Sequence, residues 1–284
     1  QVVEGFLSEL PYHFETEVLF AADYGVPQQR ERVFFIGIRD DIYDGESLSP
    51  ERSHIPGDED DVSANSSGTG AGQLKLGEVN SVEKADLKEY WTLWEAISDL
   101  PQVGAGEGQE RFEYPKPPEN EYQERMREGS DYIYNHVPMN HTDRIVERFK
   151  HIDWGESQSD VPEEHAPHIR GSTDEKSNVR YDQNNRRLYP HRLSHTITAS
   201  FYSNFIHPYL HRNFTAREAA RIQSFPDTHV FKGKKTTASN SLLKREGRED
   251  EMYMHQYGQI GNAVPPLMAK AIADRLGEIL KNYY

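Results

Sequence analysis

Three long hydrogen-bond donors stand at alternate positions near the amino end of the chain. Gln28, Arg30 and Arg32 occur in the stretch "DYGVPQQRERVFFIGIR", and residues two apart in an extended segment point to the same side. Because α/β folds bind ligands where the sheet ends, these converging amide and guanidinium groups could hold a polar ligand. Solvent-facing charges at a sheet edge would have the same spacing, so both interpretations stay open.

A second pair of arginines belongs to a predicted helix. Arg217 and Arg221 are four residues apart, which places them on one helix face. Their guanidinium groups could reach phosphates, or they could pair with Glu218 and nearby acids. The pattern alone favours the structural role.

A glycine-rich bend precedes the last predicted helix. Gly258, Gly261 and Asn262 predict a tight turn before a helix amino terminus, where a ligand can approach the backbone closely. A simple helix entry would look the same, so the turn by itself is weak support for a binding site.

Several kinds of chemistry are excluded by composition. The 284 residues contain no cysteine, which removes disulfides, thiolate zinc sites and a cysteine nucleophile from this chain. Thirteen histidines are present, but there is no HExxH motif, and the pairs His165/His168 and His191/His195 do not suggest a shared helical face. The sequence predicts no metal site.

The net charge of −15 argues against indiscriminate binding to nucleic acid, because an acidic surface repels phosphates at long range. Basic residues nevertheless collect between 205 and 248. No apolar run reaches membrane-spanning length, and the start does not resemble a secretion signal. We expect a soluble protein of the prokaryotic cytoplasm with no membrane partner; an acidic shell around a basic face would suit a salt-adapted one.

The elements that must position these residues begin with a short helix, predicted by helical spacing of apolar residues over 2–7. Alternation in 13–21 predicts a strand. The nearly continuous apolar run 31–38 predicts a strand covered on both faces. Together the two strands indicate the end of an α/β sheet.

The middle of the chain is mostly polar. Residues from about 41 to 90 are acidic and rich in Gly and Ser, and they predict a surface loop that is flexible at about 54–85. Residues 92–101 predict a short helix closed by proline. Residues 102–190 show no repeat or strong period, and their elements are not assigned.

Regular patterns return near residue 188. β-branched alternation in 192–200 is typical of a strand. Thr215 and Glu218 have the spacing of a capping box, which predicts a helix that must stop before Pro226. Two prolines then open an amphipathic helix. Its apolar face is predicted to carry Met268, Ile272, Leu276 and Ile279.

Three of these stretches, taken in order, resemble one protein family. "ADYGVPQQRERVFFIGIR", "FTAREAARIQSFPD" and "YGQIGNAVPPLMAKAIADRL" are similar to the last three sequence blocks of the DNA cytosine-5 methyltransferases. "TLWEAISDLP" and "HTITA" are also typical of that region. The chain would then be the C-terminal portion of a Rossmann-like α/β methyltransferase sheet that depends on S-adenosyl-L-methionine, with a mostly irregular target recognition domain.

The resemblance implies domain limits. Residues 1–41 would end the catalytic α/β domain, and 42–200 would form the target recognition domain. Residues 201–284 would form a segment that leads back to the catalytic domain, and the C-terminal helix would pack on that domain.

The resemblance also implies roles for single residues. Gln28, Arg30 and Arg32 would be the catalytic residues of this chain, lining the pocket of a cytosine rotated out of the duplex, with Arg32 donating to the base O2. The residues expected to close around S-adenosyl-L-methionine are Asn262, Ala263 and Val264. The residues expected to bind DNA or organise the recognition domain are Thr196, with Thr198 as an alternative alignment, and Arg217 and Arg221.

The departure from the family is as specific as the match. The cysteine nucleophile, the Glu-Asn-Val block and the Phe-x-Gly-x-Gly cofactor loop lie upstream in the family and are missing here. Because the family's reaction begins with a thiolate, this chain alone should not methylate DNA.

Three interpretations remain open. The chain could be the C-terminal half of a split enzyme, or an excerpt of a longer one. In both cases its partners would be double-stranded DNA and the N-terminal half with the Pro-Cys loop, and a cognate restriction endonuclease is a further candidate. The alternative is a non-catalytic DNA-binding or specificity module descended from such an enzyme.

Overall fold

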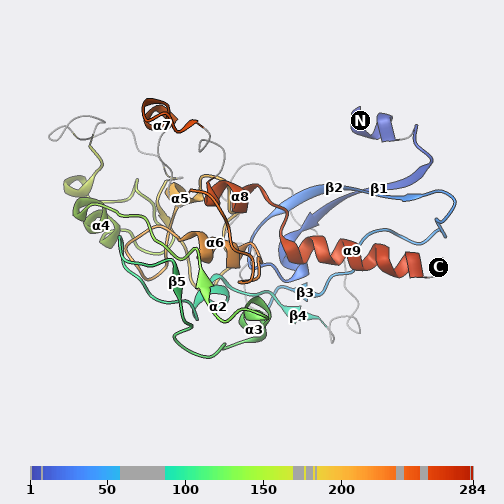
Figure 1. Ribbon diagram of the computed structural model, residues 1–284, viewed down its shortest axis with the longest axis horizontal. Helices are drawn as coiled ribbons and strands as arrows, with labels where there is room; N and C mark the ends of the chain where they lie inside the picture. The colour runs from blue at the N-terminus through green and yellow to red at the C-terminus, as the bar shows by residue number, and fades with distance from the viewer. Residues whose placement is uncertain are drawn as a thin grey trace. The chain divides into compact units, whose positions relative to one another are not determined.

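The structure of the 284-residue chain is a computed structural model that forms two compact units (Figure 1). Unit 1 comprises Gln1–Trp91 and Val264–Tyr284, and unit 2 comprises Thr92–Ala263. The residues that the structure describes are 2–7, 9–57, 87–168, 176, 182, 184–234, 240–249, 255–281 and 283.

The limits of the units differ from the predicted domain boundaries. Both expected boundaries, after residues 41 and 200, fall inside a unit rather than between units. Of the predicted flexible loop at 54–85, residues 58–85 lie outside the described residues. Within the described ranges, none of the helices combines the length and apolar content that a membrane crossing requires.

The elements follow one another in chain order. Unit 1 contains α1 (Val2–Leu7), β1 (Tyr12–Phe20), the 3-10 helix η1 (Ala21–Tyr24), β2 (Glu31–Arg39), β3 (His54–Ile55), β4 (Lys88–Glu89) and α9 (Pro266–Lys281). Unit 2 contains α2 (Leu93–Ile97), β5 (Arg111–Phe112), α3 (Glu121–Arg127), β6 (Ile133–Tyr134), α4 (Asp143–Lys150), η3 (Glu163–His165), β7 (Arg186–Arg187), α5 (Phe201–Asn204), β8 (Phe205–Ile206), α6 (Ala216–Ile222), α7 (Asn240–Arg245) and α8 (Gln256–Asn262).

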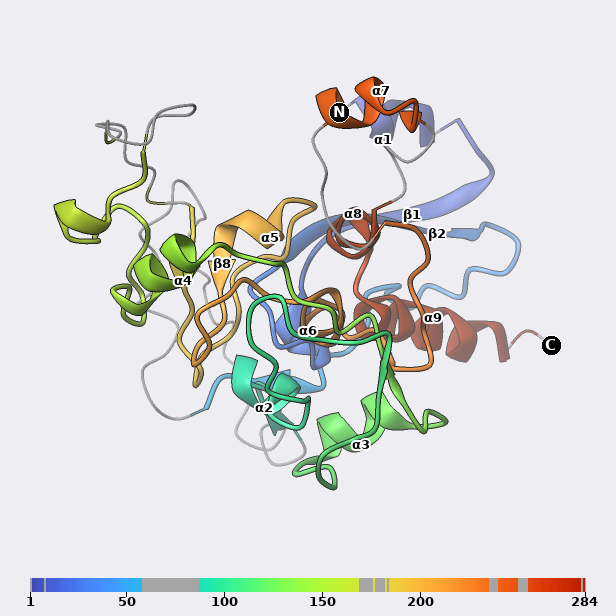
Figure 2. The same cartoon turned by 60° about the vertical axis from the view of Figure 1, so that its left-hand side comes forward.

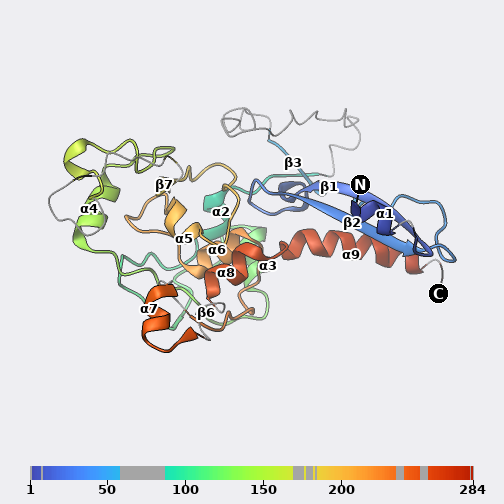
Figure 3. The same cartoon turned by 90° about the horizontal axis from the view of Figure 1, so that it is seen from above.

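Unit 1 is built on the antiparallel β1–β2 hairpin, with α9 alongside it (Figure 3). Ile36 and Ile38 of β2 form a buried core with Leu48 and with Ile279 of α9. Proline opens α9, as predicted, because a proline at the first helical position gives up no hydrogen bond. The predicted helix at 2–7 and both predicted strands are present.

The prediction that β2 is covered on both faces is wrong for the described residues. Val33 is 56% exposed and Phe35 is 42% exposed, whereas Ile36 and Ile38 are 4% and 5% exposed. Alternate residues of a strand point to opposite faces, and only the face that carries the two isoleucines meets α9. The apolar run therefore reflects one buried face and one open face.

The described residues of unit 2 are mostly irregular, and the centre of the unit is α6. Figure 2 shows α6 between α2 and α8, and α6 packs against both. The predicted capping box of Thr215 and Glu218 is formed at the start of α6, and a second capping box, which was not predicted, is formed by Thr92 and Glu95 at the start of α2. The predicted strand at 192–200 is absent; within it only Ser194 makes an isolated bridge.

Candidate functional site

Gln28 and Arg30 lie on the turn that leads into β2, and Arg32 is the second residue of that strand. The helix η1 ends at Gly25, whose φ of 78° lies in the left-handed region that glycine adopts without strain. The N–H of Ala21 donates to the carbonyl oxygen of Arg30 at 2.8 Å and closes the turn. Gln28 and Arg30 are 0% and 2% exposed, whereas Arg32, inside β2, is only partly buried.

The structure brings the guanidinium groups of Arg30 and Arg32 close enough to act on each other. Burial first, and the charge of Arg32 second, lower the pKa of Arg30 to about 10. Burial also lowers the pKa of Arg32, whose Nη1 donates to the carbonyl oxygen of Glu31 at 2.6 Å. Two neighbouring cations in a partly desolvated place favour an electron-rich ligand, such as the carbonyl oxygen of a base.

A buried acid fixes the turn from its other side. Asp23 in η1 accepts a hydrogen bond from the hydroxyl of Tyr90 and forms a 3.1 Å ion pair with Nε of Arg52. Burial raises the pKa of Asp23 even though both partners act to lower it. A Cβ at Gly25 would lie 2.7 Å from the imidazole of His54, which packs on the turn. These positioning residues were not predicted, because Tyr90 is 67 residues from Asp23 in the chain.

The predicted glycine turn is wrong: Gly258 and Gly261 lie inside helix α8. The His255 side chain caps this helix by accepting a hydrogen bond from the N–H of Gly258 at 2.7 Å. At the other end, the buried amide of Gln223 donates to the carbonyl oxygens of Ile260 and Ala263 at 3.2 and 3.0 Å. The segment is helical despite two glycines because side chains satisfy both of its ends.

Gly261 allows α8 to lie directly against the segment that carries Thr196. A Cβ at Gly261 would stand 2.2 Å from the carbonyl carbon of Thr198, a distance that only glycine tolerates. Thr196 is partly buried and its neighbour Ile197 is 0% exposed. Within unit 2, the structure thus brings the backbone of Thr198, the alternative to Thr196, close to the helix that ends at Asn262.

We expect Gly261→Ala to lower the free energy of unfolding by about 2 kcal/mol or more, since backbone must move to make room for the methyl group. Gly277→Ala in α9 is the matched control: an added Cβ there meets nothing within 4 Å, so this variant should gain about 0.5–1 kcal/mol. Urea denaturation of both variants measures the difference. Equal effects would contradict the close contact at Gly261.

The predicted cofactor residues lie at the carboxyl end of α8 and directly after it. Asn262 is exposed as the last residue of the helix, and the N–H of Ala263 donates to the carbonyl oxygen of Ile260 at 3.2 Å. Val264 is 44% exposed. An exposed amide close in sequence to an exposed apolar side chain suits a ligand that has both polar and apolar parts.

Arg217 and Arg221 of α6 are 0% exposed and face carboxylates and carbonyls inside unit 2. Arg221 donates to Asp227 at 2.7 Å and to Asp99 at 3.1 Å. Burial acts to lower the pKa of Arg221, but the two carboxylates raise it above its ordinary value. Arg217 donates to the carbonyl oxygen of His229 at 2.7 Å. The prediction that these arginines contact DNA is corrected, since neither group reaches the surface.

Glu218 has a second role that its capping-box spacing did not reveal. Its carboxylate accepts two hydrogen bonds from the guanidinium of Arg212, at 2.8 and 2.7 Å. Burial opposes ionisation, but Arg212 lowers the pKa of Glu218 below its ordinary range. Arg212 also donates to the carbonyl oxygen of Val103 at 2.6 Å. The only signal in the sequence was that Arg212 and Glu218 carry opposite charges. They are six residues apart, and helix spacing does not single out such a separation.

A neutral histidine lies beside this ion pair. His207 is 0% exposed, and its Nδ1 accepts hydrogen bonds from the N–H groups of Tyr209 and Leu210 at 3.1 Å. Burial, the largest influence, lowers the pKa of His207 to about 3, although Glu218 acts to raise it.

The stability of unit 2 should therefore fall in mild acid. The unfolded histidine binds a proton near pH 6.5 and the folded one only near pH 3, so the stabilisation is complete above pH 6.5 and is lost as the pH falls. His207→Gln should remove about 2 kcal/mol of the stability loss between pH 6.5 and 5. His191→Gln, at an exposed position, is the control. Denaturation at the two pH values tests this, and an unchanged pH dependence in His207→Gln would contradict it.

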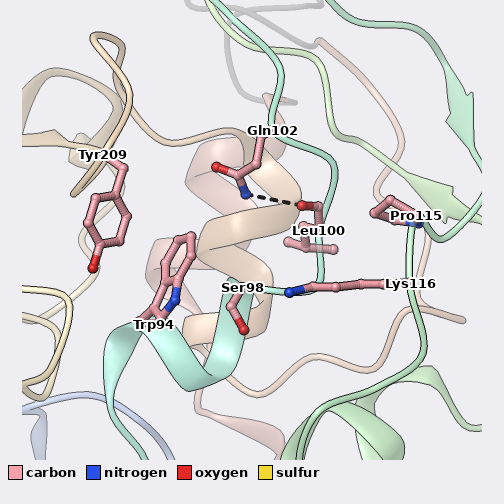
Figure 4. Close-up of a pocket in the computed structure, with 7 residues that line it drawn as sticks. All are labelled: Trp94, Ser98, Leu100, Gln102, Pro115, Lys116 and Tyr209. Carbon is pink, nitrogen blue, oxygen red and sulfur yellow. Dashed lines mark hydrogen bonds between the residues drawn. The ribbon is translucent and has the colours of Figure 1, made fainter.

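Unit 2 also contains a pocket of about 620 Å³. It is lined by Trp94, Ser98, Leu100, Gln102, Pro115, Lys116 and Tyr209 (Figure 4). The polar lining groups bond within the protein: Gln102 donates to the carbonyl oxygen of Leu100, and both Ser98 and Lys116 bond to Glu119. No predicted site residue lines this pocket. In the part of the chain that the structure describes, no three metal-binding side chains gather.

The fold is that of an α/β, methyltransferase-like protein with an irregular second unit. The family described as C-5 cytosine-specific DNA methylase matches residues 1–278, and the chain belongs to this family.

Individual relatives agree with that assignment. The type II methyltransferase M.DdeI of Desulfomicrobium norvegicum is 45% identical over 275 residues, which are 97% of this chain and 57% of M.DdeI. The type II methyltransferase M.AquIB of Picosynechococcus is 33% identical over 149 residues, 52% of this chain and 91% of M.AquIB.

One solved structure shares the fold. A protein described as a DNA modification methyltransferase encoded within a prophage (E. coli) matches with a TM-score of 0.57 at 20% identity, over 98% of this chain and 63% of the other. Against the relative M.DdeI, the present chain spans little more than half of the relative's length.

Proposed function

We propose that this chain is the C-terminal part of a DNA cytosine-5 methyltransferase, which transfers a methyl group from S-adenosyl-L-methionine to C5 of a cytosine flipped out of double-stranded DNA. The observation that carries the proposal is a family match over residues 1–278 in a chain without cysteine. The nucleophile then belongs to a complementary part, which carries the Pro-Cys loop. The names of the relatives, type II methyltransferases, support a restriction-modification system with a cognate endonuclease.

The paired-arginine turn would hold the flipped base. Arg32 is only partly buried, so its guanidinium can be approached and can donate to the cytosine O2. Arg30 lies behind it, and its charge adds to the positive potential that favours an oxygen acceptor. Gln28, fully buried, would position the turn. This arrangement keeps the base oriented while C5 becomes nucleophilic.

The segment after α8 would contribute to the cofactor pocket. Asn262 and Val264 offer an amide and an apolar side chain, which fit the polar and apolar parts of S-adenosyl-L-methionine, and Ala263, whose carbonyl oxygen accepts from Gln223, would hold the segment between them in place. The cofactor supplies the methyl group. The residues of this chain would bind and orient it.

Unit 2 would carry the recognition of DNA. Thr196 remains the proposed DNA contact, because it is partly exposed and α8 supports its segment through Gly261. Arg217 and Arg221 would position that surface from the inside rather than touch phosphates.

The test combines the purified chain with the complementary part, encoded upstream of it, and measures transfer of a labelled methyl group to duplex DNA of random sequence. The mixture should be active and each part alone inactive. Methyl transfer by this chain alone would contradict the proposed division of labour. An inert mixture in which the chain still binds DNA would favour the non-catalytic specificity module instead.

A further inference from the structure

One face of the β1–β2 hairpin is apolar and exposed. Val18 is 63% exposed, and the residue paired with it across the hairpin, Val33, is 56% exposed. Phe35 and Tyr12, on the same face by strand alternation, are 42% and 40% exposed. A contiguous group of large apolar side chains open to water marks an interaction surface rather than ordinary protein surface.

The residues of this face are ordered by the hairpin itself. Phe14 lies across from Gly37, and a Cβ at Gly37 would stand 2.3 Å from the Phe14 ring. The ring therefore fills the space above the glycine and stacks with Tyr12 at 5.8 Å between centroids. An apolar surface that is already ordered loses little conformational entropy when a partner covers it.

The opposite face of the same hairpin shows what a covered face looks like in this protein. There Phe34, Ile36 and Ile38 pack against Leu48 and Ile279. In the described part of the chain the sheet has two strands, and a two-stranded sheet with one open face is marginally stable in water by itself. Among the residues that the structure describes, the hairpin therefore has no covering layer on its Val18–Val33 side.

We infer that this open face, formed by Tyr12, Phe14, Val18, Val33 and Phe35, is the docking surface for the complementary part of the methyltransferase. The occupant follows from the comparison: the chain aligns along almost its whole length with only 57% of M.DdeI. The rest of M.DdeI has no counterpart here, and an unpaired apolar sheet face calls for a polypeptide that supplies an apolar layer. The inference rests on the proposed function, and it names the surface through which the two parts assemble.

The test measures association without catalysis. The complementary part, encoded upstream of this chain, is immobilised, and binding of the chain is measured with neither DNA nor S-adenosyl-L-methionine present. The key variant is Val18→Lys combined with Val33→Glu, because opposite charges directly across the hairpin preserve strand pairing. The control is Trp154→Lys in unit 2, where another large side chain is 43% exposed.

The wild-type chain should bind in a one-to-one complex, and the Lys/Glu variant should bind at least about 30-fold more weakly. The control should bind within about twofold of wild type, even though it loses the hydrogen bond from Trp154 to the carbonyl oxygen of Pro208. The thermal unfolding midpoint of the Lys/Glu variant should match that of the wild type, since Val18 and Val33 are both more than half exposed in the chain alone.

Several outcomes would overturn the inference. These are wild-type affinity in the Lys/Glu variant, the absence of a one-to-one complex, or a coding sequence with no complementary part. A dimer of the chain alone that the variant abolishes would assign the face to a second copy instead. A complex that forms but transfers no methyl group would refute the proposed function and leave this docking surface in place.

Discussion

Asp227→Asn should lower the free energy of unfolding by about 3–5 kcal/mol, because it leaves buried guanidinium groups without their shared counter-charge. Asp227 is 0% exposed. Its carboxylate accepts hydrogen bonds from Arg221 at 2.7 Å, from Arg217 at 3.4 Å and from the hydroxyl of Tyr114 at 2.6 Å. Asparagine has the same size, so the loss reports charge rather than packing.

The matched control is Asp274→Asn in α9. Asp274 pairs with Lys270 across one helical turn, and both side chains are more than half exposed. An exposed pair of this kind contributes at most about 0.5 kcal/mol. Denaturant titrations of both variants give the comparison. A loss of less than about 1 kcal/mol for Asp227→Asn would show that the ion pairs of Asp227 with Arg217 and Arg221 do not stabilise unit 2 as proposed.

Arg32→Ala should lower kcat of the assembled methyltransferase by about 30-fold or more, which corresponds to about 2 kcal/mol of transition-state stabilisation. The physical reason is the loss of the proposed charged donor to the base, where negative charge would develop during the reaction. Arg32→Lys should recover part of the rate, because it restores the charge without the planar pair of donors.

Arg39→Ala is the control for that variant. Arg39 lies on the same strand, its side chain is 57% exposed, and it pairs with the exposed Asp41. Steady-state kinetics of the three variants should show a change in kcat for Arg32 alone, with the unfolding midpoint unchanged. Equal turnover in Arg32→Ala and wild type would remove the base-holding role.

The elements with a complete local signal were predicted correctly. Thr215 and Glu218 predict the start of α6 from a stretch of four residues. The spacing of apolar residues within α9 is enough to predict that helix. Strand β1 followed from local alternation and strand β2 from its apolar run, although their antiparallel pairing was not predicted. In each case the information that fixes the element lies inside the element.

The wrong predictions depend on partners far away in the chain. Gly258 and Gly261 look like a turn until Gln223, more than thirty residues earlier, is seen to hold the carboxyl end of α8. The burial of Arg221 depends on Asp99, 122 residues away. No periodicity within a helix can reveal such a partner.

The open face of β2 was misjudged for a related reason. A continuous apolar run predicts cover on both sides, whereas the described residues of this chain supply one covering layer. If the docking inference is right, the pattern describes β2 in the assembled enzyme, where Val33 and Phe35 would be buried too.

The identity of the methylated base tests the account most directly. DNA incubated with S-adenosyl-L-methionine, this chain and the complementary part is digested to nucleosides and analysed by mass spectrometry. The account predicts 5-methyl-deoxycytidine in the complete mixture and none when either polypeptide is omitted. A methyl group on an exocyclic nitrogen of cytosine or adenine, or 5-methyl-deoxycytidine made by this cysteine-free chain alone, would contradict it.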